Sequence, residues 1–381
     1  MKVWSYHIPT RIHFGQGILE KLEEILKGYS DTRRVLVISG SHHLKASGLE
    51  ARLAELIDKT RKEPIFYTKV PPEPTVEAVE EALAFAKSVW PHIVVGVGGG
   101  SPLDVAKVVA MMLINGGRVS SLVGVYEPFK RDGIPYIAIP TTSGSGSEVT
   151  PYAVIIDPSV PRKAPIVSRR SFPVHALVDP QLTISCSPDL TARTGVDALS
   201  HCIEAFLSQK ALPLTDLAAK EGARLVFQHL IDAVRDGENL ELREKMALAS
   251  LMGGLAIAGA GAGLIHQLGH ALAVFNGISH GEAMALFMVP VLEFYGEAAQ
   301  DKLEVLALQG EIDPSEFINW LRGWLASMGL PTSLRDVEYD PAWKDQMVEL
   351  VMSRRSVLET LPLTPTPQDL KDLLEKMASP P

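Results

Sequence analysis

The chain has 381 residues, which predicts two domains, and its 46% hydrophobic and 21% charged residues are typical of a soluble globular protein. The net charge of −9, without a cluster of Lys or Arg, argues against nonspecific nucleic-acid binding. No apolar run reaches the roughly 20 residues of a membrane-spanning helix, and the first residues lack the apolar core of a signal peptide. The two cysteines, Cys186 and Cys202, make neither a disulfide framework nor a Cys-rich zinc motif. We therefore expect a cytoplasmic protein that binds neither membranes nor nucleic acids.

The first half of the chain alternates between short apolar runs and segments with helical periodicity. The runs that predict strands cover residues 34–39, 92–97, 136–140 and 153–157. Helical periodicity covers residues 75–90 and 104–112. Continuous Val and Ile runs separated by helices predict a parallel sheet that is covered on both faces.

The pattern changes near residues 183–190, where β-branched runs end and long helical segments begin. We therefore predict an α/β domain over residues 1–185 and a helical domain over residues 186–381. The last helix, amphipathic, is expected at residues 368–377.

Two glycine-rich loops follow predicted strands. Gly98, Gly99 and Gly100 precede Ser101 and open a helix, and this arrangement favours an anion such as a pyrophosphate. The common G-x-G-x-x-G spacing is absent, so a plain strand–helix turn is an alternative. The second loop supplies hydroxyl groups that suit a nicotinamide ribose or a phosphate, from Thr141, Thr142, Ser145 and Ser147. Two such loops at strand ends predict a dinucleotide site.

Potential metal ligands occur in the second half at helical spacing. Asp197 and His201 form one i,i+4 pair, His266 and His270 form another, and His280 follows. If the helices face each other, two such pairs can surround one divalent cation. A polar helix stripe is the alternative for the first pair, and packing is the alternative for His270.

With these motifs together, the chain resembles the iron-containing (group III) alcohol dehydrogenases over nearly its whole length. The resemblance rests on segments 9–17, 98–107, 140–148, 178–180, 190–201, 266–281 and 329–331. It implies a Rossmann-like N-terminal domain that binds a dinucleotide and an all-α, metal-binding and catalytic C-terminal domain, the dehydroquinate synthase-like fold. The implied activity is hydride transfer between a nicotinamide cofactor and a primary alcohol or its aldehyde.

The resemblance also implies roles for individual residues. The metal ligands would be Asp197, His201, His266 and His280. His270 would lie near the nicotinamide instead, and it is the candidate for moving a proton. Iron, as Fe(II), is implied by the resemblance alone, because three nitrogens and one carboxylate suit Zn(II) almost equally.

Four further residues belong to the expected cofactor site, and two of them bear on the choice of cofactor. Asp104 is expected either to contact the nicotinamide amide or to order the loop, and Leu182 is included in the cofactor-binding set. NAD-selective enzymes usually place an acidic residue after the second strand, whereas this chain has Gly40 and Ser41, followed by His42 and Lys45. We expect NADP(H) to be preferred and NAD(H) to be the alternative. If Gly40 is only a turn residue, the choice between the two cofactors stays open.

Other functions remain as alternatives at this point. They are a glycerol dehydrogenase-like polyol oxidoreductase, a dehydroquinate synthase-like metal lyase and a non-catalytic nucleotide-binding protein. The substrate is expected to be a small alcohol or aldehyde. A homodimer is compatible with the resemblance, which leaves the oligomeric state open.

Overall fold

The computed structural model describes residues 3–41, 43–160 and 162–379. The chain separates into two compact units, Ile8–Cys186 and a second unit made of Met1–His7 with Ser187–Pro381. The first unit contains all the strands among the described residues, and the second is helical.

A six-stranded parallel sheet forms the centre of the first unit. Its order is β1-β8-β5-β4-β2-β3. The strands span Arg11–Phe14 (β1), Arg34–Gly40 (β2), Glu63–Val70 (β3), Ile93–Gly98 (β4), Tyr136–Pro140 (β5) and His175–Val178 (β8). The carboxyl ends of the central neighbours β4 and β5 carry the two glycine-rich loops, so the strand pairing brings both loops to one edge of the sheet.

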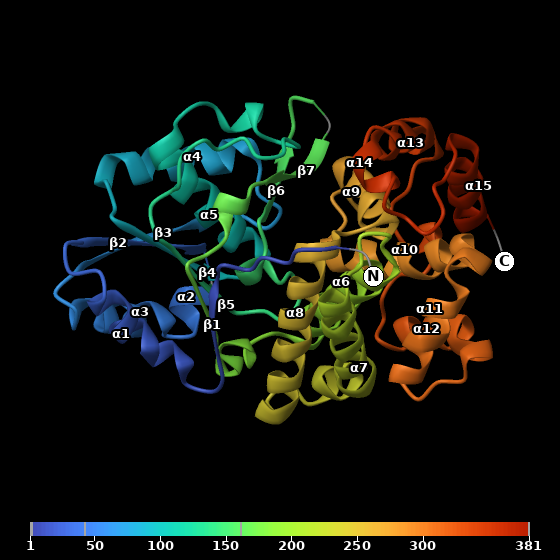
Figure 1. Cartoon of the computed structure of the whole chain (residues 1–381), viewed down its shortest axis with the longest axis horizontal. Helices are drawn as coiled ribbons and strands as arrows, with labels where there is room; N and C mark the ends of the chain where they lie inside the picture. Colours follow the sequence, from blue (N-terminus) through green and yellow to red (C-terminus); the bar gives the residue numbers. More distant parts are fainter. Residues whose placement is uncertain (1–2, 42, 161, 380–381) are drawn as a thin grey trace. The chain divides into compact units, whose positions relative to one another are not determined.

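Helices cover both faces of this sheet (Figure 1). They are α1 (Lys21–Lys27), α2 (His43–Ala46), α3 (Leu49–Asp58), α4 (Val76–Val89) and α5 (Gly100–Asn115). Alternate side chains of β2 separate the two cores, because successive strand residues point to opposite faces. Val35 and Val37 pack with α1 and α3, whereas Leu36 and Ile38 pack with α4 and α5. Both faces are buried, as the continuous apolar runs predicted.

The prediction that residues 153–157 join the parallel sheet is wrong. This segment is β6 (Tyr152–Asp157), and it pairs antiparallel with β7 (Arg162–Val167) in a separate two-stranded sheet. A parallel pairing needs a crossover of about a dozen residues, usually a helix. The residues after β5 form the second glycine-rich loop instead, and a short turn then returns the chain beside β6.

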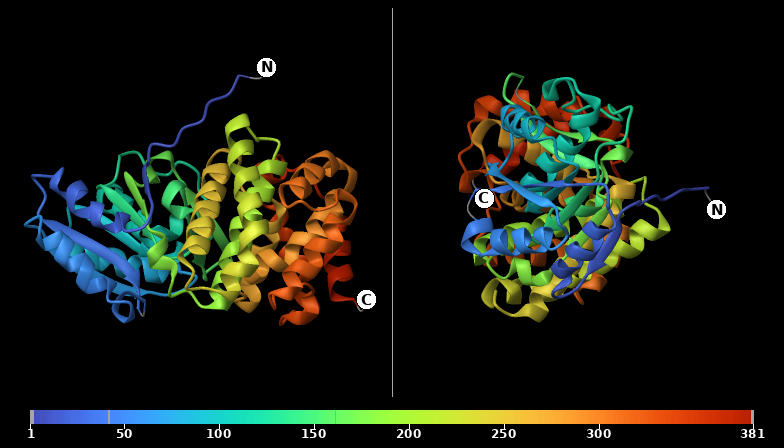
Figure 2. Two further views of the ribbon diagram at one scale, coloured as in Figure 1. Left: turned by 90° about the horizontal axis from the view of Figure 1, so that it is seen from below. Right: turned by 90° about the vertical axis from the view of Figure 1, so that its left-hand side faces the viewer.

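The second unit consists of helices. They are α6 (Pro188–Leu207), α7 (Pro213–Arg235), α8 (Leu240–Ala260), α9 (Leu264–Asn276), α10 (His280–Tyr295), α11 (Gln300–Gln309), α12 (Phe317–Ser327), α13 (Lys344–Met352), α14 (Arg355–Leu358) and α15 (Pro367–Ala378). The long helices α6, α7 and α8 pack against one another and are seen side by side in yellow-green to gold in Figure 2. Helix α15 lies where the amphipathic pattern predicted a final helix.

Close contacts at glycines let α9 and α10 approach α6 and each other. A Cβ atom at Gly281, in the first turn of α10, would lie 2.2 Å from the carbonyl oxygen of Arg193 on α6. A Cβ atom at Gly269 on α9 would lie 2.4 Å from the methyl carbon of Met284 on α10. Side chains at these positions would separate the three helices, so the two glycines set how closely the residues on them can meet.

Among the described residues, no single helix is long and apolar enough to cross a bilayer. The consecutive helices α8 and α9, bent by 100° at their junction, satisfy the length and composition criteria only as a pair.

Candidate functional site

The first pair of candidate ligands lies in the middle of α6. Ser187 begins this helix by accepting a hydrogen bond from the Leu190 amide, and Pro188 occupies the first turn, where a missing N–H is tolerated. Asp197 and His201 are one turn apart and both only 5% exposed. Two polar side chains that are so deeply buried need compensating interactions.

The other candidate ligands reach the same place from two more helices. His266 lies in the first turn of α9, and His280 is the first residue of α10. The Nε2 atoms of His201 and His266 are each 3.7 Å from Asp197 Oδ1, and that of His280 is 3.3 Å away. Three imidazoles therefore surround one carboxylate oxygen.

These separations fit a shared divalent cation. Metal–ligand bonds of about 2.0–2.2 Å in a tetrahedron place neighbouring donor atoms about 3.4 Å apart. Potential donor atoms of Asp197, His201 and His266 all lie within 4.8 Å of one another. His280 is outside that mutually close group, although its contact with Asp197 is the shortest of the three. We regard Asp197, His201 and His266 as the core of the candidate metal site and His280 as a fourth candidate ligand.

The protonation states of these groups also suit a cation. Burial alone would raise the pKa of Asp197, but His201 and His280 hold that pKa well below its usual value. Burial lowers the pKa of His201 to about 4. At neutral pH the carboxylate is thus ionised and His201 is neutral, which are the forms that bind metals.

Glu204 is a residue of this site that the sequence analysis did not single out. It lies one turn after His201 on α6 and is 4% exposed. Its Oε2 atom is 2.5 Å from His266 Nδ1, on the side of the ring away from Asp197. The i,i+3 spacing from His201 places Glu204 on the ligand-bearing helix face, and this spacing could have identified it.

His270 lies one turn after His266 on α9 and is 8% exposed. Its ring stacks on that of His280 at 5.3 Å and meets the ring of His266 edge-on at 6.0 Å. The other three histidines each approach Asp197 Oδ1 through Nε2. The structure therefore groups His270 with the candidate centre but gives it different neighbours.

In the first unit, the two glycine-rich loops pack against each other. The Thr141 amide donates to the carbonyl oxygen of Gly98, at 2.9 Å. Cβ atoms at Gly99 and Gly100 would lie 3.2 Å from Thr142 Oγ1 and 3.1 Å from Ser145 Cβ. Glycine at these positions lets the second loop approach closely, because a Cβ atom would make its side chains shift. Gly99, Gly100 and Thr142 remain partly exposed, as do Ser101 and Ser145.

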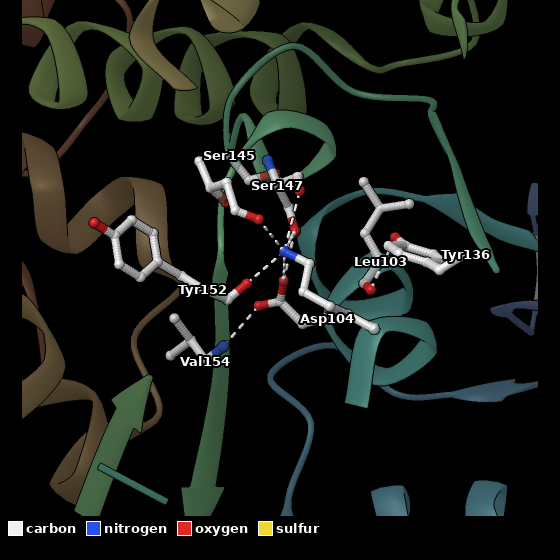
Figure 3. A network of polar contacts seen from close by, with 9 residues as sticks. Leu103, Asp104, Tyr136, Ser145, Ser147, Tyr152 and Val154 are labelled. Atoms are coloured by element: carbon white, nitrogen blue, oxygen red, sulfur yellow. Dashed lines mark hydrogen bonds and ion pairs between the residues drawn. The ribbon is translucent and has the colours of Figure 1, made fainter. Parts of the chain in front are cut away.

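The buried residues of the loops form a polar network below this surface (Figure 3). Asp104 accepts hydrogen bonds from Ser147 Oγ at 2.6 Å and from the Val154 amide at 2.8 Å. Lys107 Nζ donates to the carbonyl oxygens of Thr150 and Tyr152 and to Ser147. The carboxylate of Asp104 therefore ties α5 to the second loop and to β6, which is the loop-ordering role considered for it.

The network buries charges as well as hydrogen bonds. Lys107 is 1% exposed, and burial lowers its pKa to about 8. Glu148, 2% exposed in the same loop, has a pKa raised to about 7 by burial. The cation lies among several carbonyl oxygens and close to Asp104, at 3.9 Å, and this arrangement offsets part of its desolvation.

The remaining cofactor candidates lie at other strand ends. Gly40 ends β2 and is partly exposed, and the exposed Ser41 follows it. His42, named with them, lies outside the described residues. Leu182 belongs to a 3₁₀ turn after β8 and lines a cavity of about 470 Å³ with Gly17, Gly48 and Arg52.

Comparisons with known proteins identify the family. The profile of the iron-containing alcohol dehydrogenases matches residues 9–180, and the C-terminal profile of the same family matches residues 191–378. The chain belongs to the iron-containing alcohol dehydrogenase family. It is accordingly a metal-dependent oxidoreductase that acts on alcohols or aldehydes, with the two-part α/β and helical fold of that family.

Individual relatives agree with this assignment. The chain is 32% identical to alcohol dehydrogenase 4 of Saccharomyces cerevisiae over 340 residues, 88% of each protein. It is 33% identical to an NAD-dependent methanol dehydrogenase of Bacillus methanolicus, over 76% of this chain and 75% of that protein. An iron-containing alcohol dehydrogenase of Thermotoga maritima superposes with a TM-score of 0.87 at 34% identity, over 98% of this chain and 99% of the other.

Proposed function

We propose that this enzyme interconverts small primary alcohols and aldehydes with NADP(H) as the preferred cofactor and Fe(II) at a site made of Asp197, His201, His266 and His280. The observation that carries the metal assignment is the convergence of three imidazole nitrogens on Asp197 Oδ1 at 3.3–3.7 Å. Zn(II) fits the same donor set, and iron is preferred because of the family to which the chain belongs.

The bound cation would supply Lewis acidity toward the substrate oxygen. The protein's contribution is a set of donors on three packed helices, of which Asp197, His201 and His266 are buried and His280 is partly buried. The low pKa of Asp197 keeps one negative charge at the site, and the lowered pKa of His201 keeps that imidazole neutral.

We assign to His270 the transfer of a proton during turnover. The side chain lies next to the candidate ligands, with its ring stacked on His280 and edge-on to His266. An imidazole is suited to this role because its ordinary pKa lies near neutral pH.

The glycine-rich loops would hold the dinucleotide. The amides at the N-terminus of α5 offer an anion site for the pyrophosphate, and Gly99, Gly100 and Ser101 lie there. Thr142 and Ser145 offer partly exposed hydroxyls, and Thr141 supports the loop from its buried position. We assign Gly98, Asp104 and Ser147 a supporting role and keep Leu182 as an apolar contact for the cofactor.

The preference for NADP(H) rests on the end of β2. Residues 40–45 contain no acidic side chain, and Lys45 is exposed. A 2′-phosphate would therefore meet no carboxylate there and could attract Lys45 and Ser41. The Bacillus methanolicus relative is described as NAD-dependent, so the family as such does not decide the preference.

Substitution of Gly40 tests this preference. A Cβ atom at Gly40 would lie 3.5 Å from the Val70 carbonyl oxygen, an ordinary contact, so Gly40→Asp adds a charge without a clash. For reduction of a primary aldehyde, we expect wild-type kcat/KM to favour NADPH. Gly40→Asp should shift the ratio toward NADH by at least about tenfold, or ~1.4 kcal/mol, with a smaller effect at high salt.

Gly40→Ala is the matched control, because it adds the Cβ atom without the carboxylate and should keep the wild-type preference. A wild-type kcat/KM with NADH that equals or exceeds the value with NADPH would contradict the proposal. Metal analysis of protein purified without oxygen, with activity measured before and after addition of Fe(II), tests the metal assignment separately.

We also infer a cytoplasmic location, since Cys186 and Cys202 are not joined in a disulfide. A homodimer is the oligomeric state that we would test first, by light scattering.

A further inference from the structure

The carboxylate of Glu204 joins two helices of the second unit. Its Oε1 atom accepts hydrogen bonds from the backbone amides of Ile265, at 2.6 Å, and His266, at 3.4 Å. Its Oε2 atom is 2.5 Å from Nδ1 of the His266 ring. One side chain on α6 therefore contacts both the backbone and the imidazole of a residue 62 positions later in the sequence.

The backbone contacts cap the start of α9. Gly263 precedes this helix and has no side chain to accept hydrogen bonds from the first amides. Glu204 supplies that acceptor from another helix, and its negative charge suits a helix N-terminus. A Cβ atom at Gly263 would lie 3.0 Å from Glu204 Oε1, so glycine at this position allows the carboxylate its close approach.

The ring contact determines which nitrogen of His266 is available. A carboxylate accepts hydrogen bonds. The hydrogen of the His266 ring is therefore on Nδ1, and this N–H group donates a hydrogen bond to Glu204. The lone pair is then on Nε2, the atom 3.7 Å from Asp197 Oδ1. A carboxylate behind a histidine ligand fixes its tautomer and orientation and increases its basicity.

We propose that Glu204 is a positioning residue that sets the metal affinity of this enzyme by holding His266 with Nε2 presented to the cation. The proposal rests on the ligand set given under the proposed function.

Glu204→Gln is the informative variant. The site requires acceptors at both side-chain oxygen positions, one for His266 Nδ1–H and one for the amides of α9. A Gln side chain has one acceptor and one donor, so it either loses the cap or forces His266 into the tautomer whose Nε2 carries a proton. The size of the side chain is unchanged.

The measurement is the Zn(II) dissociation constant of the metal-free protein, determined by competition with a chelator, together with the melting temperature of the same metal-free samples. We expect the Zn(II) affinity of Glu204→Gln to fall by about 10- to 100-fold. A role only in capping α9 would lower the melting temperature without weakening Zn(II) binding to the folded protein. Glu282→Gln is the matched control, because Glu282 lies on α10 beside His280 but contacts Ser279 and Arg193.

Gly263→Ala tests the same contact without removing a polar group. The added methyl group would lie 3.0 Å from Glu204 Oε1, so the carboxylate must shift and Zn(II) affinity should again fall. If Glu204→Gln does not fold, Gly263→Ala tests the positioning role of Glu204 in its place. Unchanged affinity in a folded Glu204→Gln or Gly263→Ala protein would overturn the proposal. Failure of the wild-type protein to bind Zn(II) would instead reject the ligand set itself.

Discussion

Among the four clustered histidines, the neighbours of each ring distinguish its role. His201, His266 and His280 each approach Asp197 through Nε2, whereas His270 stacks on His280 at 5.3 Å. Two of these histidines, His266 and His270, share one face of α9, one turn apart. Helical spacing alone therefore does not tell which of His266 and His270 is the candidate ligand. The approach of His266 to Asp197 favours His266.

This difference predicts opposite effects of two alanine substitutions. His266→Ala removes one of four donors and should lower metal content to a small fraction of one equivalent, with loss of activity. His270→Ala should keep nearly one equivalent of metal but reduce turnover by about 10²–10⁴-fold, which is the usual contribution of proton transfer by a positioned side chain. Elemental analysis and steady-state kinetics on the same preparations provide both values.

The assignment of His270 would be wrong if His270→Ala lost its metal. Full metal content in His266→Ala would remove His266 from the ligand set, and His280→Ala provides the corresponding test at α10.

At the scale of elements, a pair of histidines links two strands at one side of the sheet. His13 on β1 and His175 on β8 lie with Nε2 and Nδ1 3.1 Å apart and with stacked rings. The sequence analysis did not expect this pair, because the two residues are 162 positions apart. Burial lowers the pKa of His175 to about 4, with a further contribution from His13, Arg11 and Lys21. Burial also lowers the pKa of His13.

The depressed pKa of His175 predicts a loss of stability in acid. The unfolded chain binds a proton near pH 6.5, while the folded chain resists protonation until about pH 4. The contribution of His175 is therefore fully present above pH 6.5 and is lost progressively as the pH falls toward 4. His175→Phe keeps a ring but cannot titrate, so its melting temperature should fall less than that of the wild type between pH 7 and 4.5.

The comparison of the two melting curves isolates His175 from the carboxylates, which titrate in both proteins. Parallel pH dependence in the two proteins would show that His175 does not contribute.

At the scale of the whole molecule, each compact unit carries one part of the chemistry. All four candidate ligands and Glu204 belong to the helical unit, whereas the glycine-rich loops and Gly40 belong to the α/β unit. Each set is assembled by contacts within its own unit. Metal binding and nucleotide binding should therefore be separable properties of the protein.

Removal of the metal should lower stability without weakening the binding of the nucleotide. A ligand at 100 times its dissociation constant stabilises the folded state by about 2.7 kcal/mol. For a unit of this size that corresponds to roughly 5–10 °C in melting temperature. The dissociation constant of NADPH, measured by fluorescence without substrate, should stay the same after treatment with a chelator. A large loss of NADPH affinity would show that the two sites are coupled.

Local patterns predicted much of this structure. Apolar runs identified β2, β4 and β5, and the two glycine-rich loops were found where β4 and β5 end. Three strands of the sheet were not predicted. β1 and β8 have only four residues each, and β3 contains a proline and buries only Tyr67 and Val70. Such segments become strands because a neighbouring strand in the folded sheet pairs with them.

The sequence by itself determined the helical spacing of Asp197 with His201 and of His266 with His270, the two glycine-rich loops and the absence of an acidic residue directly after β2, since all three depend on residues a few positions apart. Only the tertiary structure decided the remaining features. It brought α6, α9 and α10 together, placed Glu204 behind His266, engaged both oxygens of Asp104 within the loop network and turned β6 into a hairpin with β7. These outcomes depend on packing and hydrogen bonds between distant segments, and the energy of such contacts exists only once the chain has folded.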